Sequence, residues 1–91
     1  MARKSARSIL VVLVGKRKDA ALNVQKILTD WGCLIKTRLG IHDGILNKCS
    51  DTGLIILELV GSSEKMSELT RKMNVLPSVK AQLVSLSLDK K

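Results

Sequence analysis

The sequence is almost free of aromatic residues, because Trp31 stands alone and phenylalanine and tyrosine are absent. Apolar residues still make up 45% of the 91 residues, so aliphatic side chains must form nearly all of the core. Many RNA-binding domains stack bases on aromatic side chains of their central strands. The apolar runs of this chain offer only leucine, isoleucine and valine for that purpose, which argues against this kind of nucleic-acid binding.

Histidine, cysteine and long apolar runs are also scarce. Cys33 and Cys49 lie 16 residues apart and outside any CxxC pattern, so we expect reduced thiols and not a disulfide framework or a zinc knuckle. No apolar run approaches the roughly 20 residues that a membrane-spanning helix needs. We therefore expect a soluble, cytoplasmic protein without a membrane partner.

Catalytic and cofactor-binding motifs are missing as well. The chain lacks HExxH, GxSxG and the phosphate-binding GxxxxGK[ST], and its carboxylates show no pairing that spacing alone reveals. We expect a protein that is not an enzyme and that carries no cofactor.

The net charge of +8 is distributed unevenly, with cations concentrated at both ends of the chain. Residues 1–7 lack apolar periodicity and are predicted to form a flexible basic arm, residues 8–88 a single domain, and residues 89–91 a short tail. Such a charge favours nucleic acid, acidic partners or anionic ligands, but it also serves solubility. Both interpretations remain open.

Two segments, 8–14 and 54–60, are apolar at nearly every position, which is typical of central strands covered on both sides. A helix is predicted between Asp19, as its N-cap, and Gly32, as the residue that ends it. Its apolar stripe is Ala20, Ala21, Val24, Ile27, Leu28 and Trp31. A strand with strict alternation follows at 34–41. There, Ile35, Thr37, Leu39 and Ile41 are expected on one side, and Leu34, Lys36, Arg38 and Gly40 on the other.

A second helix is predicted after the turn and cap at residues 61–63, ending before Pro77. Its buried stripe is Met66, Leu69, Thr70, Met73 and Leu76. The last strand, 79–88, changes phase, because Val79, Ala81 and Leu83 share one face whereas Val84, Leu86 and Leu88 share the other. Either a bulge lies near Leu83 and Val84, or the distal half leaves its own sheet and packs on another subunit.

The order strand, helix, strand, strand, helix, strand predicts an α+β fold, the ferredoxin-like βαββαβ two-layer sandwich. Its antiparallel four-stranded sheet carries both helices on one face, with the first and third strands in the centre. Apolar side chains on the opposite face of those strands would remain in water. A patch of that size usually marks an interface, so we predict a homodimer or a higher homo-oligomer.

The segments VVLV, GKRKDA, TRLGIHDG and DTGLIILELVGSSEKMSELTRKMNVLPSVKAQLVSL together resemble the iron-only hydrogenase system regulator family. This family is ACT-like and is related to the ligand-binding domain of nickel-responsive repressors. The resemblance spans about residues 8–88, which would then form an ACT-like domain. It implies a non-catalytic, transcription-related regulatory module that senses a small ligand at a subunit interface.

Six residues are candidates for ligand binding: Gly15, Lys16, Arg17, Arg38, Gly40 and His42. The turn at Gly15 corresponds to the place where amino-acid-binding ACT domains hold their ligand, and free amides at the following helix start could receive an anion. An ordinary turn with solvated charges is the alternative. Lys36 and Arg38 would either approach the subunit interface, where Glu58 or a bound anion would compensate them, or display their charge to solvent on an edge strand.

His42 and Cys49 flank one polar loop, in a region comparable to that where nickel-responsive repressors place histidine and cysteine ligands. The histidine-rich pattern of those repressors is missing, so we expect no metal. Two other functions remain open beside the sensor: a nucleic-acid-binding ferredoxin-like domain, and a purely structural oligomerisation domain without a ligand.

Overall fold

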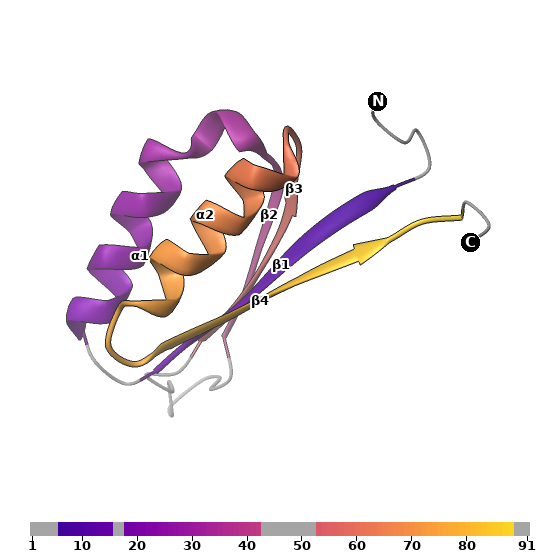
Figure 1. Ribbon diagram of the computed structural model, residues 1–91. Coiled ribbons are helices and arrows are strands. Elements are labelled where there is room, and N and C mark those ends of the chain that lie inside the picture. Colours follow the sequence, from indigo (N-terminus) through magenta and orange to yellow (C-terminus); the bar gives the residue numbers. More distant parts are fainter. Residues whose placement is uncertain (1–5, 16–17, 43–52, 89–91) are drawn as a thin grey trace.

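The computed structural model describes residues 6–15, 18–42 and 53–88. The chain forms β1 (Arg7–Val14), α1 (Lys18–Asp30), a short 3-10 helix η1 (Gly32–Leu34), β2 (Ile35–His42), β3 (Gly53–Leu59), α2 (Ser63–Asn74) and β4 (Val79–Leu86). The strands make one sheet in the order β2-β3-β1-β4, and all neighbours are antiparallel. Both helices lie on the same side of this sheet (Figure 1). The predicted ferredoxin-like fold is confirmed, with β1 and β3 in the centre.

One side of the sheet and the inner faces of both helices form the core. Its members are Leu10, Val12, Val14, Ala20, Val24, Leu28, Leu57, Leu59, Met66, Leu69, Met73, Val79 and Ala81. Each of these side chains is at most 8% exposed, and no polar side chain is buried among the described residues. Aliphatic packing therefore holds the two layers together, as the shortage of aromatic residues required.

The ends of α1 differ from the prediction. The helix begins at Lys18, so Asp19 lies inside its first turn and is not the N-cap, although a carboxylate there still favours the helix dipole. Ala21 is exposed. At the other end the chain tightens into η1, where the Leu34 amide donates to the Trp31 carbonyl at 3.0 Å. Gly32, predicted to end the helix, does not adopt the left-handed conformation common at helix ends, because the chain continues into the 3-10 turn.

The second helix follows the prediction closely. The Ser62 hydroxyl accepts a hydrogen bond from the Lys65 amide at 3.2 Å, which caps the helix start. The helix ends at Asn74, three residues before Pro77. The Asn74 side chain then bonds the outer edge of β4, since its Nδ2 donates to the Ala81 carbonyl at 2.9 Å and its Oδ1 accepts from the Ala81 amide at 2.7 Å. This pair covers backbone groups that an edge strand would otherwise leave unpaired.

Strand β2 contains a register shift that the strict alternation did not predict. Ile35 faces Leu59 and Thr37 faces Glu58 across the β2–β3 ladder, so Lys36 is an extra residue. Ile35 consequently lies on the helix side, whereas Thr37 lies on the opposite side. The prediction that these two share a face is wrong, because a bulge shifts the alternation by one residue.

Strand β4 contains no bulge. Its register with β1 is continuous from Val14 opposite Val79 to Arg7 opposite Leu86. The predicted irregularity near Leu83 and Val84 is therefore wrong, and the distal half does not leave the sheet before Leu86. The strand stays regular: Val79, Ala81 and Leu83 lie on the helix side of the sheet, whereas Val84 and Leu86 lie on the opposite side. β1 also starts at Arg7, one residue earlier than predicted, so Arg7 belongs to the sheet and not to the predicted N-terminal segment.

Candidate functional site

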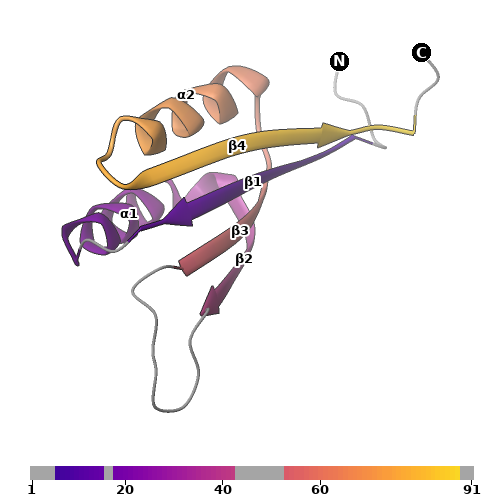
Figure 2. The same cartoon turned by 90° about the horizontal axis from the view of Figure 1, so that it is seen from below.

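The sheet side that faces away from the helices is the most extensive candidate site, and we call it the open face. Figure 2 shows both helices on one side of the sheet and none on the other. The strand registers place nine aliphatic side chains on the open face: Ile9, Val11, Leu13, Leu39, Ile41, Leu54, Ile56, Val84 and Leu86. The prediction that the helices shelter only one of two apolar sheet faces is confirmed.

Much of the open face is in contact with solvent in the single chain. Five of its side chains, Leu13, Leu39, Ile41, Val84 and Leu86, are between 36% and 63% exposed. Fully burying one such side chain is worth about 1.5 to 3 kcal/mol, so burying what these five still expose would contribute about 4 to 7 kcal/mol. A contiguous apolar surface of this extent is characteristic of an interaction site.

An ion pair lies at one end of the open face. Arg7 Nη2 donates to Glu58 Oε1 at 2.8 Å, and Arg7 Nε pairs with Glu58 Oε2. The Glu58 side chain is 13% exposed and the Arg7 side chain 60%. The hydrogen bond from Arg7 lowers the pKa of Glu58, and the nearby charge of Lys36 lowers it further. Glu58 is the only acidic side chain that the described strands carry, and the chain's own cations compensate it.

This pairing changes the roles predicted for Lys36 and Arg38. The bulge separates the two, so that Lys36 acts on Glu58 while Arg38 lies opposite Leu57, on the helix side. Arg38 Nη2 donates to the side-chain oxygen of Gln25 on α1 at 2.6 Å, and the residue is exposed. The prediction that Arg38 approaches a sheet interface with Glu58 as its partner is wrong. Its position agrees with the alternative, a cation displayed on an edge strand.

A shallow pocket of about 260 Å³ adjoins the open face at the opposite end of the sheet from the ion pair. It is lined by Leu13, Gly15, Ser78, Val79 and Lys80. The Gly15 amide donates to the Ser78 carbonyl at 2.6 Å, and Ser78 has a φ of 64°. A Cβ on Gly15 would lie 3.1 Å from both the Cβ and the carbonyl oxygen of Ser78, so this close approach favours glycine. Among the described lining residues, Lys80 alone is charged.

Of the other candidate residues, Arg38 and Gly40 are described by the structure, and neither lines this pocket. Gly40 is exposed in β2, the edge strand farthest from β4, and a Cβ there would meet nothing within 4 Å. Gly15 and Gly40 therefore do not form one site. Lys16, Arg17, Cys49 and the side chain of His42 lie outside the described residues, so their predicted roles remain predictions.

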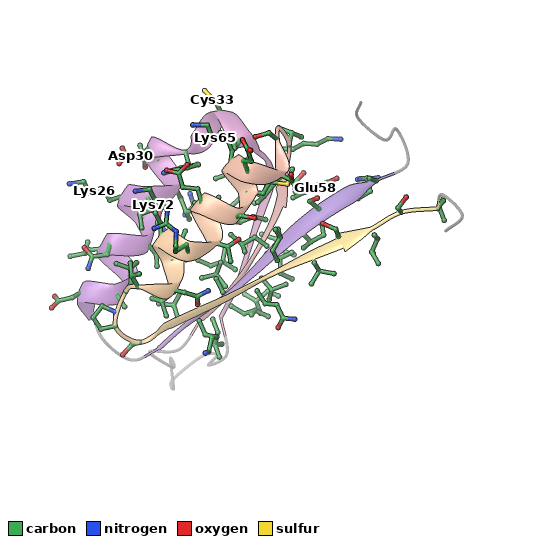
Figure 3. The ribbon with its side chains drawn as sticks, viewed as in Figure 1. Lys26, Asp30, Cys33, Glu58, Lys65 and Lys72 are labelled. Atoms are coloured by element: carbon green, nitrogen blue, oxygen red, sulfur yellow. The ribbon has the colours of Figure 1, made fainter. Side chains whose placement is uncertain are left out.

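No cluster of three or more histidine, cysteine, aspartate or glutamate side chains suited to a metal occurs within the described segments. Cys33 is exposed in η1, and Figure 3 shows it at the end of the helical layer where α1 finishes. Lys65 of α2 lies 5.9 Å from the centroid of the Trp31 ring, which places the single aromatic side chain against a cation on the same layer. None of the helices in the described part of the chain is long and apolar enough to cross a membrane.

Sequence reasoning missed two arrangements. The Arg7–Glu58 pair joins residues 51 positions apart, and only the register of β1 on β3 brings them together. A second shallow hollow, of about 550 Å³, runs along the outer surface of α2 and is lined by Ser63, Glu64, Ser67, Glu68 and Arg71. The i, i+3 and i+4 spacing of these polar residues could have indicated a shared helix face, although it would not have indicated a hollow.

No protein-family model matches the chain, and no curated protein matches it. Solved structures do match. The uncharacterized protein TM1266 from Thermotoga maritima superposes with a TM-score of 0.77 at 22% identity, covering 89% of this chain and 96% of that one. The protein CPII from Thiomonas intermedia K12, solved with ADP, AMP and acetate, superposes with a TM-score of 0.56 at 11% identity, covering 93% and 90% of the two chains. These similarities support the ferredoxin-like fold.

Proposed function

We propose that this protein is a small, non-enzymatic regulatory module that assembles with copies of itself through the open face and binds a small ligand at or beside that interface. The observation that carries the proposal is the open face itself. Its nine aliphatic side chains lie opposite the layer of helices, and the described residues form no second layer that covers them. A ligand that binds better to one assembly state than to another would then shift the assembly equilibrium.

The pocket at Gly15 is the first place to look for the ligand. It shares Leu13 with the open face, and Lys80 gives it a positive charge, so an anionic group suits it. Because CPII has been solved with ADP, AMP and acetate, adenine nucleotides and acetate are sensible first probes. The resemblance of the sequence to iron-only hydrogenase system regulators supports a transcription-related role for the assembly.

Two measurements test the proposal. Sedimentation equilibrium of the wild-type chain over a range of concentrations should detect a homo-oligomer. Thermal melting with ADP, AMP or acetate should then show a midpoint that rises with ligand concentration, since a ligand at 100 times its Kd stabilises the folded state by about 2.7 kcal/mol. A monomeric wild-type chain would refute the assembly, and an oligomer that no metabolite stabilises would favour the purely structural oligomerisation domain.

The net charge of +8 supports the alternative of nucleic-acid binding. The open face argues against it, because the described strands place aliphatic residues where a base-stacking surface needs aromatic ones. A gel-shift series against salt discriminates between the two. Tight binding to RNA that weakens steeply as salt rises would favour the alternative.

A further inference from the structure

The N-terminal end of β1 and the C-terminal end of β4 run together past both helices (Figures 1 and 2). We call this part the arm and define it as residues 7–9 and 84–88; from here on the word does not refer to the predicted N-terminal segment. It stays part of the sheet, since Arg7 lies opposite Leu86 and Ile9 lies opposite Val84. The arm therefore extends the open face beyond the part of the sheet that the helices cover.

The two sides of the arm differ in polarity. On the helix side, the buried Leu10 and the partly buried Leu83 are followed, one step further out, by Ser8 and Ser85, whose hydroxyl oxygens lie 3.2 Å apart. The sequence thus changes from leucine to serine where helix cover ends, as expected for a surface that meets water. On the open side, β4 shows no such change.

On the open side, β4 stays apolar to its end, and Arg7 of β1, which lies opposite Leu86 there, is paired with Glu58. Ile9 and Val84 are followed by Leu86, which is 63% exposed, and Leu88 beyond the strand is 90% exposed. If both sides of the arm met solvent in the working protein, both should carry polar residues. The contrast between serine on one side and leucine on the other indicates that the open side of the arm is covered.

We propose that a second copy of the chain covers it: in a two-fold assembly, the arm of each copy lies across the open face of the other. This inference rests on the proposed function. The arm cannot cover its own open face, because both belong to one continuous sheet. The Glu58 carboxylate on this face is compensated by Arg7 of the same chain, so this end of the surface needs no charged partner. A second copy supplies aliphatic side chains of the same kind, and two-fold symmetry makes every contact twice.

The test compares Leu86→Asp with Leu22→Asp by sedimentation equilibrium of the full chain. Leu22 is a matched control, because it is 71% exposed on α1 and receives the same substitution. Leu86→Asp should raise the dimer Kd on the order of 100-fold, since each interface would have to bury two added carboxylates in place of two leucine side chains. Leu22→Asp should leave the Kd within about threefold of the wild type. Circular dichroism should show that both variants keep the fold.

The outcomes separate this inference from the proposed function. A wild-type dimer that Leu86→Asp does not weaken would overturn the arm contact and leave assembly through the open face standing; a different partner would then cover the arm. A monomeric wild type would overturn both. Should Leu86→Asp lose its fold, Leu86→Ser is used instead. It introduces the residue that the other side of the arm already carries, and it should raise the Kd on the order of tenfold; an unchanged Kd would again overturn the arm contact.

Discussion

Leu57 and Leu13 lie in the neighbouring strands β3 and β1, and their side chains point to opposite faces of the sheet. Leu57 is 0% exposed in the core, whereas Leu13 is 47% exposed on the open face. The same substitution, leucine to alanine, should therefore have two different effects. It should reduce folding stability at Leu57 and self-association at Leu13.

Leu57→Ala should lower the free energy of unfolding by about 2 to 5 kcal/mol, the range for deleting a fully buried leucine side chain. In a domain of this size that corresponds to a fall in Tm of roughly 4 to 8 °C for each kcal/mol. Leu13→Ala should cost folding only about 1 kcal/mol, because its own chain buries about half of the side chain.

The other half of Leu13 is available to a partner. Burying it is worth about 0.7 to 1.4 kcal/mol per copy. Two-fold symmetry doubles this to about 1.4 to 2.8 kcal/mol, which corresponds to a rise in the dimer Kd of roughly 10 to 100-fold in Leu13→Ala. Leu22→Ala, on the outer surface of α1, is the control and should change neither quantity.

Urea unfolding at several protein concentrations measures stability, and sedimentation equilibrium measures the Kd. In the dimer, the unfolding midpoint should rise with protein concentration, and Leu13→Ala should shift this dependence to higher concentrations. A Leu13→Ala protein that dimerises as tightly as the wild type would refute the assignment of the open face to the interface.

Three further predictions follow from single contacts. Ser62→Ala should destabilise the chain by about 1 kcal/mol in urea melts because it removes the N-cap of α2, and Ser62→Gly should cost only a few tenths. Asn74→Ala should cost about 1 to 3 kcal/mol, since it removes both hydrogen bonds to Ala81, and no loss of stability would show that water replaces them. Glu58→Gln should be less stable than the wild type near neutral pH. Because Arg7 lowers the pKa of Glu58, this difference is present above the ordinary carboxyl pKa of about 4.3 and should disappear as pH falls below it; a gap that persists in acid would contradict the ion pair.

The prediction of the fold succeeded where local patterns were sufficient. Segments apolar at nearly every position marked β1 and β3, helical spacing marked both helices, and Ser62 was part of the predicted cap. Because the order of these elements allows few topologies, it also predicted that one apolar sheet face would remain uncovered. The open face could thus be predicted from sequence before any coordinates were known.

Register was the property that local patterns could not supply. The bulge at Lys36 depends on how β2 aligns with β3, and it moved Arg38 to the helix side, away from its predicted partner. The phase change in β4 predicted either a bulge or a distal half that leaves the sheet, and only the pairing with β1 showed a regular strand that stays in the sheet as far as Leu86.

The amino-acid sequence by itself determined which residues are apolar, in which elements they lie and in what order those elements follow. The tertiary structure decided which distant residues meet, as with Arg7 and Glu58 or Gly15 and Ser78. The physical reason is that helical stripes and strand alternation depend on neighbours along the chain, whereas strand register depends on hydrogen bonds between segments that the sequence keeps far apart.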